Sequence, residues 1–197
     1  MPVIVDPAMV RTFRDAAAFE RWLAKHHDRE TELWIKIHKK ASGLKSITAV
    51  EAIDVCLCWG WIDGIRKGLD ETSFLQRYTP RGRKSVWSKV NVANVARLTA
   101  AGRMTAQGQR HVDAAQADGR WAAAYQIKSA TVPPDLKQAI DASPTARATF
   151  ATLSAQNRFA IIYRTNALKT PAGRAKKIAA IVNMLARGET IYPQRKR

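Results

Sequence analysis

The chain has 197 residues, of which 46% are hydrophobic and 25% are charged, with ten glycines and eight prolines. This composition is typical of a folded globular protein, and it excludes a collagenous, low-complexity or wholly disordered chain. The 33 Lys and Arg residues outnumber the 16 Asp and Glu residues and leave a formal net charge of +17. We therefore expect polyanions, anionic surfaces or small anionic ligands as partners.

The distribution of charged residues and cysteines indicates the compartment. Charged residues from Asp6 to Asp15 interrupt any apolar signal sequence at the N-terminus. Even the most apolar stretch, residues 49–62, contains two acids and is too short to span a bilayer. Cys56 and Cys58 point to opposite sides of a predicted helix, so we expect buried, reduced thiols. These features predict a soluble, cytoplasmic protein that does not insert into membranes.

Hydrophobic periodicity predicts a helix and a strand near the N-terminus. Apolar residues at i, i+3, i+4 and i+7 predict an amphipathic helix over residues 16–27. Strict alternation of apolar and polar residues predicts a strand over residues 32–38. Further on, Thr48 followed by Glu51 is a capping-box pattern that begins a mostly buried helix, which Gly60 ends.

The central segment is predicted to contain a hairpin, a basic loop and two helices. Two short strands, over residues 62–67 and 73–78, flank a turn and favour a β-hairpin. The loop over residues 79–91 is rich in Lys and Arg, and Ser88 is a suitable N-cap for a helix that runs to about residue 101. A further helix is expected over residues 105–116.

The C-terminal part is predicted to be helical. Pro133 and Pro134 give the clearest boundary signal in the chain, and three helices are expected to begin with proline in the first turn, at Pro134, Pro144 and Pro171. We therefore expect an α+β fold with two domains. The first, residues 1–130, holds a small antiparallel sheet with covering helices, and the second, residues 131–197, is a helical subdomain with a basic tail.

Aromatic and basic side chains alternate on the predicted strands and on the basic loop. Trp34 and Lys36 share one strand face, and an aromatic wall with polar rim groups suits a small ligand. We expect a Trp-lined, Arg-rimmed cleft formed by Trp34, Lys36, Trp61, Asp63, Arg66, Arg77, Arg81, Ser85, Trp87 and Asn91. The alternative is ordinary core packing of the tryptophans.

The basic residues gather in two regions of the chain. Residues 66–110 contain ten Lys and Arg residues against two acids, and residues 163–197 contain nine against one. In the first region, Arg81, Arg83 and Lys84 surround the N-terminus of the helix predicted at Ser88, a favourable place for an anion. A basic surface of this kind also binds nucleic acid without reading bases, or is simply solvated.

No sequence motif for a cofactor, a metal or a catalytic triad is present. The chain lacks a P-loop and a GxGxxG motif, so we expect no nucleotide cofactor. The four histidines are scattered and do not have metal-ligand spacing, so we expect no metal. An enzyme that uses Asp63 with Arg77 as an acid and an anion clamp is the weakest alternative.

Several ordered motifs carry a resemblance to a known family. They are WIKIHKKASG, EAIDVCLCWGWIDGIRKGLD, FLQRYTPRGRKSVWSKVN, LTAAGRMTAQG and the tail FATLSAQNRFAIIYRTNALKTPAGRAKKIAAIVNMLARGE. With these motifs the chain resembles the YdeI/OmpD-associated family, also called bacteriocin-protection proteins. The resemblance implies a role in resistance to toxins, antibiotics or stress, and it implies no enzyme activity.

The sequence therefore predicts a non-catalytic protection protein that binds a small molecule or peptide in the cleft. A nucleic-acid-binding accessory protein that uses the basic surface is the second reading, and its affinity is expected to fall steeply with salt. Direct capture of cationic peptides conflicts with the net charge of +17, because like charges repel.

Overall fold

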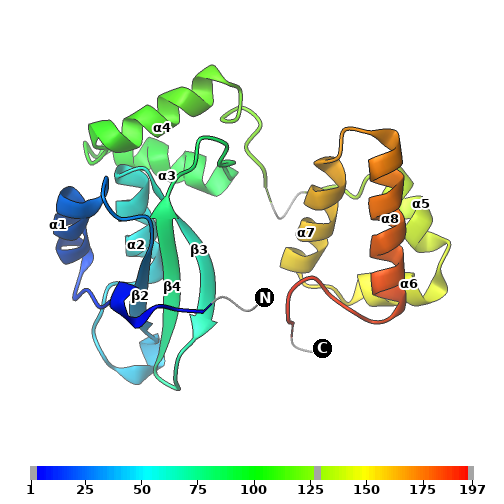
Figure 1. Ribbon diagram of the computed structural model, residues 1–197, viewed down its shortest axis with the longest axis horizontal. Coiled ribbons are helices and arrows are strands. Elements are labelled where there is room, and N and C mark those ends of the chain that lie inside the picture. Colours follow the sequence, from blue (N-terminus) through cyan, green and yellow to red (C-terminus); the bar gives the residue numbers. More distant parts are fainter. Residues whose placement is uncertain (1–3, 127–129, 195–197) are drawn as a thin grey trace. The chain divides into compact units, whose positions relative to one another are not determined.

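The computed structural model describes residues 4–126 and 130–194, and the chain divides into two compact units. Unit 1 runs from Met1 to Ala124, and unit 2 runs from Tyr125 to Arg197. Helices and strands combine in unit 1, whereas the described residues of unit 2 form helices (Figure 1). The predicted α+β class is confirmed. Residues 195–197 of the predicted basic tail lie outside the described residues.

Unit 1 packs helices against a four-stranded sheet with the strand order β1-β2-β4-β3. The strands are β1 (Val10–Arg11), β2 (Leu33–His38), β3 (Trp61–Gly68) and β4 (Ser73–Pro80). The helices are α1 (Ala16–His26), α2 (Ala49–Cys58), α3 (Lys89–Ala100) and α4 (Ala106–Ala117). β2, β4 and β3 are antiparallel as expected, whereas the unpredicted β1 pairs in parallel with β2. A two-residue strand is too short to show the alternation that predicts strands.

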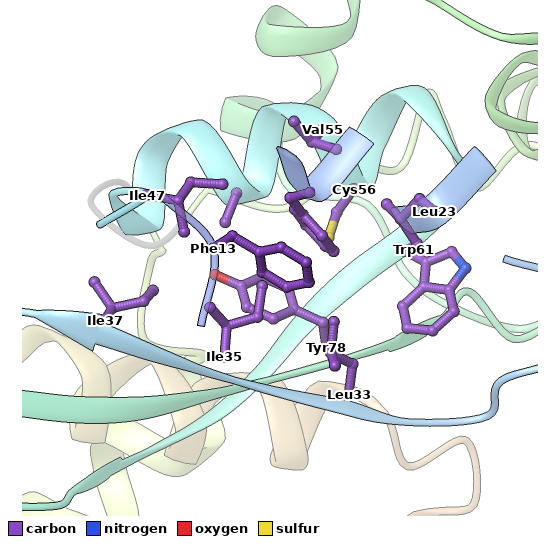
Figure 2. Close-up of a cluster of buried hydrophobic side chains, with 12 residues drawn as sticks. Phe13, Leu23, Leu33, Ile35, Ile37, Ile47, Val55, Cys56, Trp61 and Tyr78 are labelled. Atoms are coloured by element: carbon purple, nitrogen blue, oxygen red, sulfur yellow. The ribbon is translucent and has the colours of Figure 1, made fainter. Parts of the chain in front are cut away.

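The main core of unit 1 lies between the sheet and the helices α1 and α2. Leu33, Ile35 and Ile37 project from β2 toward this core, and Val55 and Cys56 meet them from α2 (Figure 2). The alternation that predicted the strand is therefore the alternation that buries one of its faces. Each fully buried Leu or Ile side chain stabilises the fold by roughly 1.5–3 kcal/mol.

A second cluster of unit 1 packs α2, α3 and α4 around Trp87. α4 approaches the end of α2 closely, because the Thr105 hydroxyl donates to the Cys58 carbonyl at 2.5 Å. Gly108 lies at the crossing, where an added Cβ would come within 2.2 Å of the Cys58 carbonyl oxygen. This contact fixes the first turns of α4 beside the start of β3.

The capping box at the start of α2 is formed as predicted. The Thr48 hydroxyl accepts the Glu51 N–H at 3.2 Å, and the Glu51 carboxylate accepts the Thr48 N–H at 2.8 Å. We expect Thr48→Ala to lower the free energy of unfolding by about 1 kcal/mol. Urea unfolding followed by tryptophan fluorescence measures it, with Thr99→Ala on the exposed side of α3 as a control expected to stay within about 0.5 kcal/mol. Equal losses in the two variants would contradict a capping role.

Unit 2 consists of α5 (Pro134–Asp141), α6 (Pro144–Ala151), α7 (Ala155–Asn166) and α8 (Pro171–Ala186). The three proline starts are confirmed, because α5, α6 and α8 each begin with proline. The core of the unit is centred on the fully buried Leu136, Ile161 and Leu185.

Among the residues that the structure describes, no helix has the length and apolarity needed to cross a membrane.

Candidate functional site

The predicted ligand-binding residues of the sheet lie on both of its faces. In the β3–β4 register Asp63 lies opposite Tyr78, and Tyr78 is buried in the core under α1 and α2. Arg77 precedes Tyr78 and projects from the other face, where it lies opposite Trp34. Asp63 and Arg77 are therefore separated by the sheet, and they do not form the acid and anion clamp that the sequence left open.

The three tryptophans expected in the cleft are core residues. Trp34, Trp61 and Trp87 are 0%, 1% and 2% exposed. The Trp34 N–H donates to the Glu32 carboxylate at 2.5 Å, and the Trp61 N–H donates to the His27 carbonyl at 3.2 Å. With the indoles buried, these residues do not line an open cleft within residues 4–126. The alternative of core packing describes them correctly.

The charged residues of the predicted set have partners on the sheet. Glu32 holds Arg77 in an ion pair, and the hydrogen bond from Arg77 lowers the pKa of Glu32. Lys36 lies 3.8 Å from a carboxylate oxygen of Asp70. Arg66 stacks on the Phe74 ring at 4.2 Å and donates to the side-chain oxygen of Gln76. The contacts of Arg77 and Lys36 link β2 to the β3–β4 hairpin, those of Arg66 lie within the hairpin, and together they point to no common ligand.

A pocket of about 380 Å³ opens beside the basic loop that follows β4. The loop and α4 form its walls together with the turn after α4, and its lining residues are Gly82, Arg83, Arg110, His111, Ala114, Asp118 and Arg120. The lining thus contains three arginines and one histidine but a single acidic residue, Asp118. We call this cavity the arginine pocket, and its charge suits an anion.

Arg120 is the best-fixed cation of the arginine pocket. Its Nη1 donates to the Ser85 carbonyl at 2.8 Å, and its Nε donates to the Asp118 carboxylate at 2.7 Å. The hydrogen bond from Arg120 lowers the pKa of Asp118. The predicted site residue Ser85 therefore contributes through its backbone, and it ties the loop to the turn after α4.

Arg81 lies behind the arginine pocket and is 5% exposed. Its guanidinium carbon lies 3.7 Å from the centre of the Trp87 ring, a close cation–π contact. Its backbone N–H donates to the Gly60 carbonyl at 2.9 Å. Burial raises the pKa of Asp63, and Arg81 and Arg66 act in the opposite direction. Asp63 thus lies near the buried charge of Arg81.

His111 is the titratable group of the arginine pocket. Burial lowers its pKa, and the positive charges of Arg81, Arg110 and Arg120 lower it further. Its imidazole packs against Gly60, where an added Cβ would come within 2.4 Å of the ring. Both effects favour the neutral imidazole, so its pKa lies below the ordinary value of about 6.5.

Of the ten predicted residues, three members of the loop lie around the pocket, namely Arg81, Ser85 and Trp87. The backbone N–H of Asn91 donates to the Ser88 hydroxyl at 3.1 Å, as part of the N-cap of α3. Sequence reasoning missed Arg110, His111, Asp118 and Arg120, which line the cavity. They follow the loop by about thirty residues, and no spacing rule links them to it. The helix break at Asp118-Gly119 was the one local signal in this segment.

Two family models match the chain, and they match different units. The first, described as a domain of unknown function (DUF8412), matches residues 11–111, just over half of the chain. The second, described as "Bacteriocin-protection, YdeI or OmpD-Associated", matches residues 129–188, and it confirms the resemblance seen in the tail. The searches of curated proteins and of solved structures gave no match.

Proposed function

We propose that this chain, which belongs to the family of the domain of unknown function DUF8412 and matches the bacteriocin-protection model over residues 129–188, protects against a toxin by binding an anionic ligand in the arginine pocket. The proposal involves no catalysis. The family description supports the protective role, and the pocket supports the choice of ligand charge.

The observation that carries the proposal is the convergence of Arg83, Arg110 and Arg120 on one cavity. A cavity of about 380 Å³ has the size of a small-molecule site, since such sites typically span roughly 300–1,000 Å³. Like charges that line one cavity repel each other, and a bound anion offsets that repulsion. A planar guanidinium also binds carboxylate and phosphate with two parallel hydrogen bonds.

The sign of the net charge limits which toxins the protein can bind. A protein of +17 repels a cationic peptide, so the ligand is an anionic toxin, an anionic part of one, or a small anion whose capture confers resistance. Electrostatic attraction also speeds the encounter of an anion with the pocket at low ionic strength.

The test combines a binding measurement with a protection assay. We expect the double variant Arg110→Gln/Arg120→Gln to weaken binding of inorganic sulfate by about 100-fold, because each lost charge-assisted hydrogen bond removes about 1.5 kcal/mol or more. Titration calorimetry of the full chain measures the affinity. A bacteriocin panel identifies the toxin against which the parent protein protects cells. Cells that express the double variant are expected to lose this protection.

The matched control is Arg147→Gln, which removes an exposed arginine from α6 in unit 2. Equal loss of sulfate binding in the control and in the double variant would assign binding to diffuse charge and contradict the pocket. Nucleic acid is the competing partner. Tight binding of labelled DNA that vanishes with salt and survives Arg110→Gln/Arg120→Gln would favour the basic surface as the functional feature.

A further inference from the structure

Beyond the charge of the ligand, the arginine pocket indicates which kind of anion it takes. Resting on the function proposed above, we propose that the pocket selects a dianionic tetrahedral group, such as the terminal phosphate of a small molecule, and that His111 takes up a proton when this group binds.

The charge balance of the lining residues is the first step. Arg83, Arg110 and Arg120 contribute three positive charges, and Asp118 contributes one negative charge. Asp118 is bound to Arg120 through Nε at 2.7 and 2.9 Å, so the protein already neutralises one guanidinium. Two positive charges remain for the ligand. A group with two negative charges balances them, whereas a single carboxylate leaves one unbalanced.

The origin of the cations is the second step. Arg83 comes from the loop after β4, Arg110 from α4, and Arg120 from the turn that follows α4. Cations that approach from three separate segments match the oxygens of a tetrahedral group, which point in several directions. A planar carboxylate is bound well by one guanidinium in a two-pronged arrangement. Because Asp118 already pairs with Arg120, one of the two remaining guanidinium groups would then lack an anionic partner.

The surroundings of His111 determine when its imidazole takes up a proton from the solvent. The charged groups that act on its pKa are Arg81 from the loop behind the pocket, Arg110 on its own helix and Arg120 from the turn after α4. Arg83 and Asp118 line the same pocket, and Asp118 is paired with Arg120. Gly60 lies against its ring and brings no charge, and Asp63 lies near Arg81. Burial and the three arginines lower the pKa of the imidazole. A bound dianion offsets those charges, raises the pKa of His111 and adds an N–H donor to the site.

This reading separates a phosphate monoester from nucleic acid. Each phosphodiester of a nucleic-acid backbone carries one negative charge, whereas a terminal phosphate carries about two near pH 7. The pocket therefore favours a small molecule with a terminal phosphate over the backbone of DNA.

Sulfate is the appropriate probe, because it remains a dianion while His111 titrates. We expect the full chain to bind sulfate at least about tenfold more tightly than acetate at equal ionic strength. Between about pH 8 and pH 5, sulfate affinity is expected to rise on acidification by up to about tenfold per pH unit, the limit for uptake of one proton. The proton signals of the His111 ring, followed by NMR, should shift toward the charged form as sulfate is added.

The matched variant is His111→Gln, which keeps a polar side chain and cannot titrate. Its sulfate affinity is expected to be independent of pH, with its thermal unfolding unchanged within a few degrees. If sulfate and acetate bind the parent equally and both need Arg110 and Arg120, the dianion inference fails while the proposed function stands. If neither anion binds, or if both bind the Arg110→Gln/Arg120→Gln variant as tightly as the parent, the proposed function itself fails. A pH dependence of sulfate affinity that persists in His111→Gln would show that His111 is not the group that takes up the proton.

Discussion

Gly108→Ala is expected to lower the free energy of unfolding of unit 1 by about 2–3 kcal/mol. An added Cβ would lie 2.2 Å from the Cys58 carbonyl oxygen and 2.6 Å from the carbonyl carbon, and these are backbone atoms that have little room to move. Helix propensity acts the other way, because alanine favours a helix over glycine by about 1 kcal/mol. Overpacking typically costs about 1–3 kcal/mol and occasionally more. Because the 2.2 Å contact is with backbone atoms, we expect a cost above this typical range, which exceeds the gain in helix propensity.

Tryptophan fluorescence reports this change selectively, because all six tryptophans lie before Tyr125 and therefore in unit 1. A loss of 2–3 kcal/mol corresponds to a fall in unfolding temperature of roughly 4–12 °C for a chain of this size. Gly68→Ala is the control, since an added Cβ there meets nothing within 4 Å. A Gly108→Ala variant that gains stability, as helix propensity alone predicts, would show that α4 does not pack as closely on α2 as described.

Trp87→Ala is expected to have the larger effect, with a loss of about 4 kcal/mol in the free energy of unfolding. The indole is 2% exposed and packs with Leu98, Val112 and Trp121 in the cluster between α2, α3 and α4. Its removal leaves a cavity, and it also takes the aromatic surface away from the buried guanidinium of Arg81. A buried cation without that contact adds to the cost.

Trp87→Phe separates the structural role of this residue from a role in ligand contact. Phenylalanine keeps an aromatic ring beside Arg81, so we expect a smaller loss of stability, below about 2 kcal/mol, and sulfate affinity within about threefold of the parent. Urea unfolding and sulfate titration measure the two quantities. Loss of sulfate binding in a Trp87→Phe protein of normal stability would mean that the indole touches the ligand, as the sequence-based cleft supposed.

The sequence alone determined most of the longer elements and several of their starts, whereas the two-residue β1 was missed. Alternation placed β2, a Thr–Glu pair placed the start of α2, and three prolines placed the starts of α5, α6 and α8. Each of these signals is local, because periodicity and capping depend on residues within one or two turns of each other. Family motifs in the tail were specific enough to be confirmed by the bacteriocin-protection model.

Tertiary structure decided which side chains meet. The order of residues suggested that Trp34, Trp61 and Asp63 share a cleft with Arg77, but strand register places them on two faces and buries the indoles. The arginine pocket depends on α4 crossing α2 at Gly108, which brings His111 and Arg120 to a loop about thirty residues earlier. Register and helix crossing follow from long-range packing, and no local spacing in the sequence encodes them.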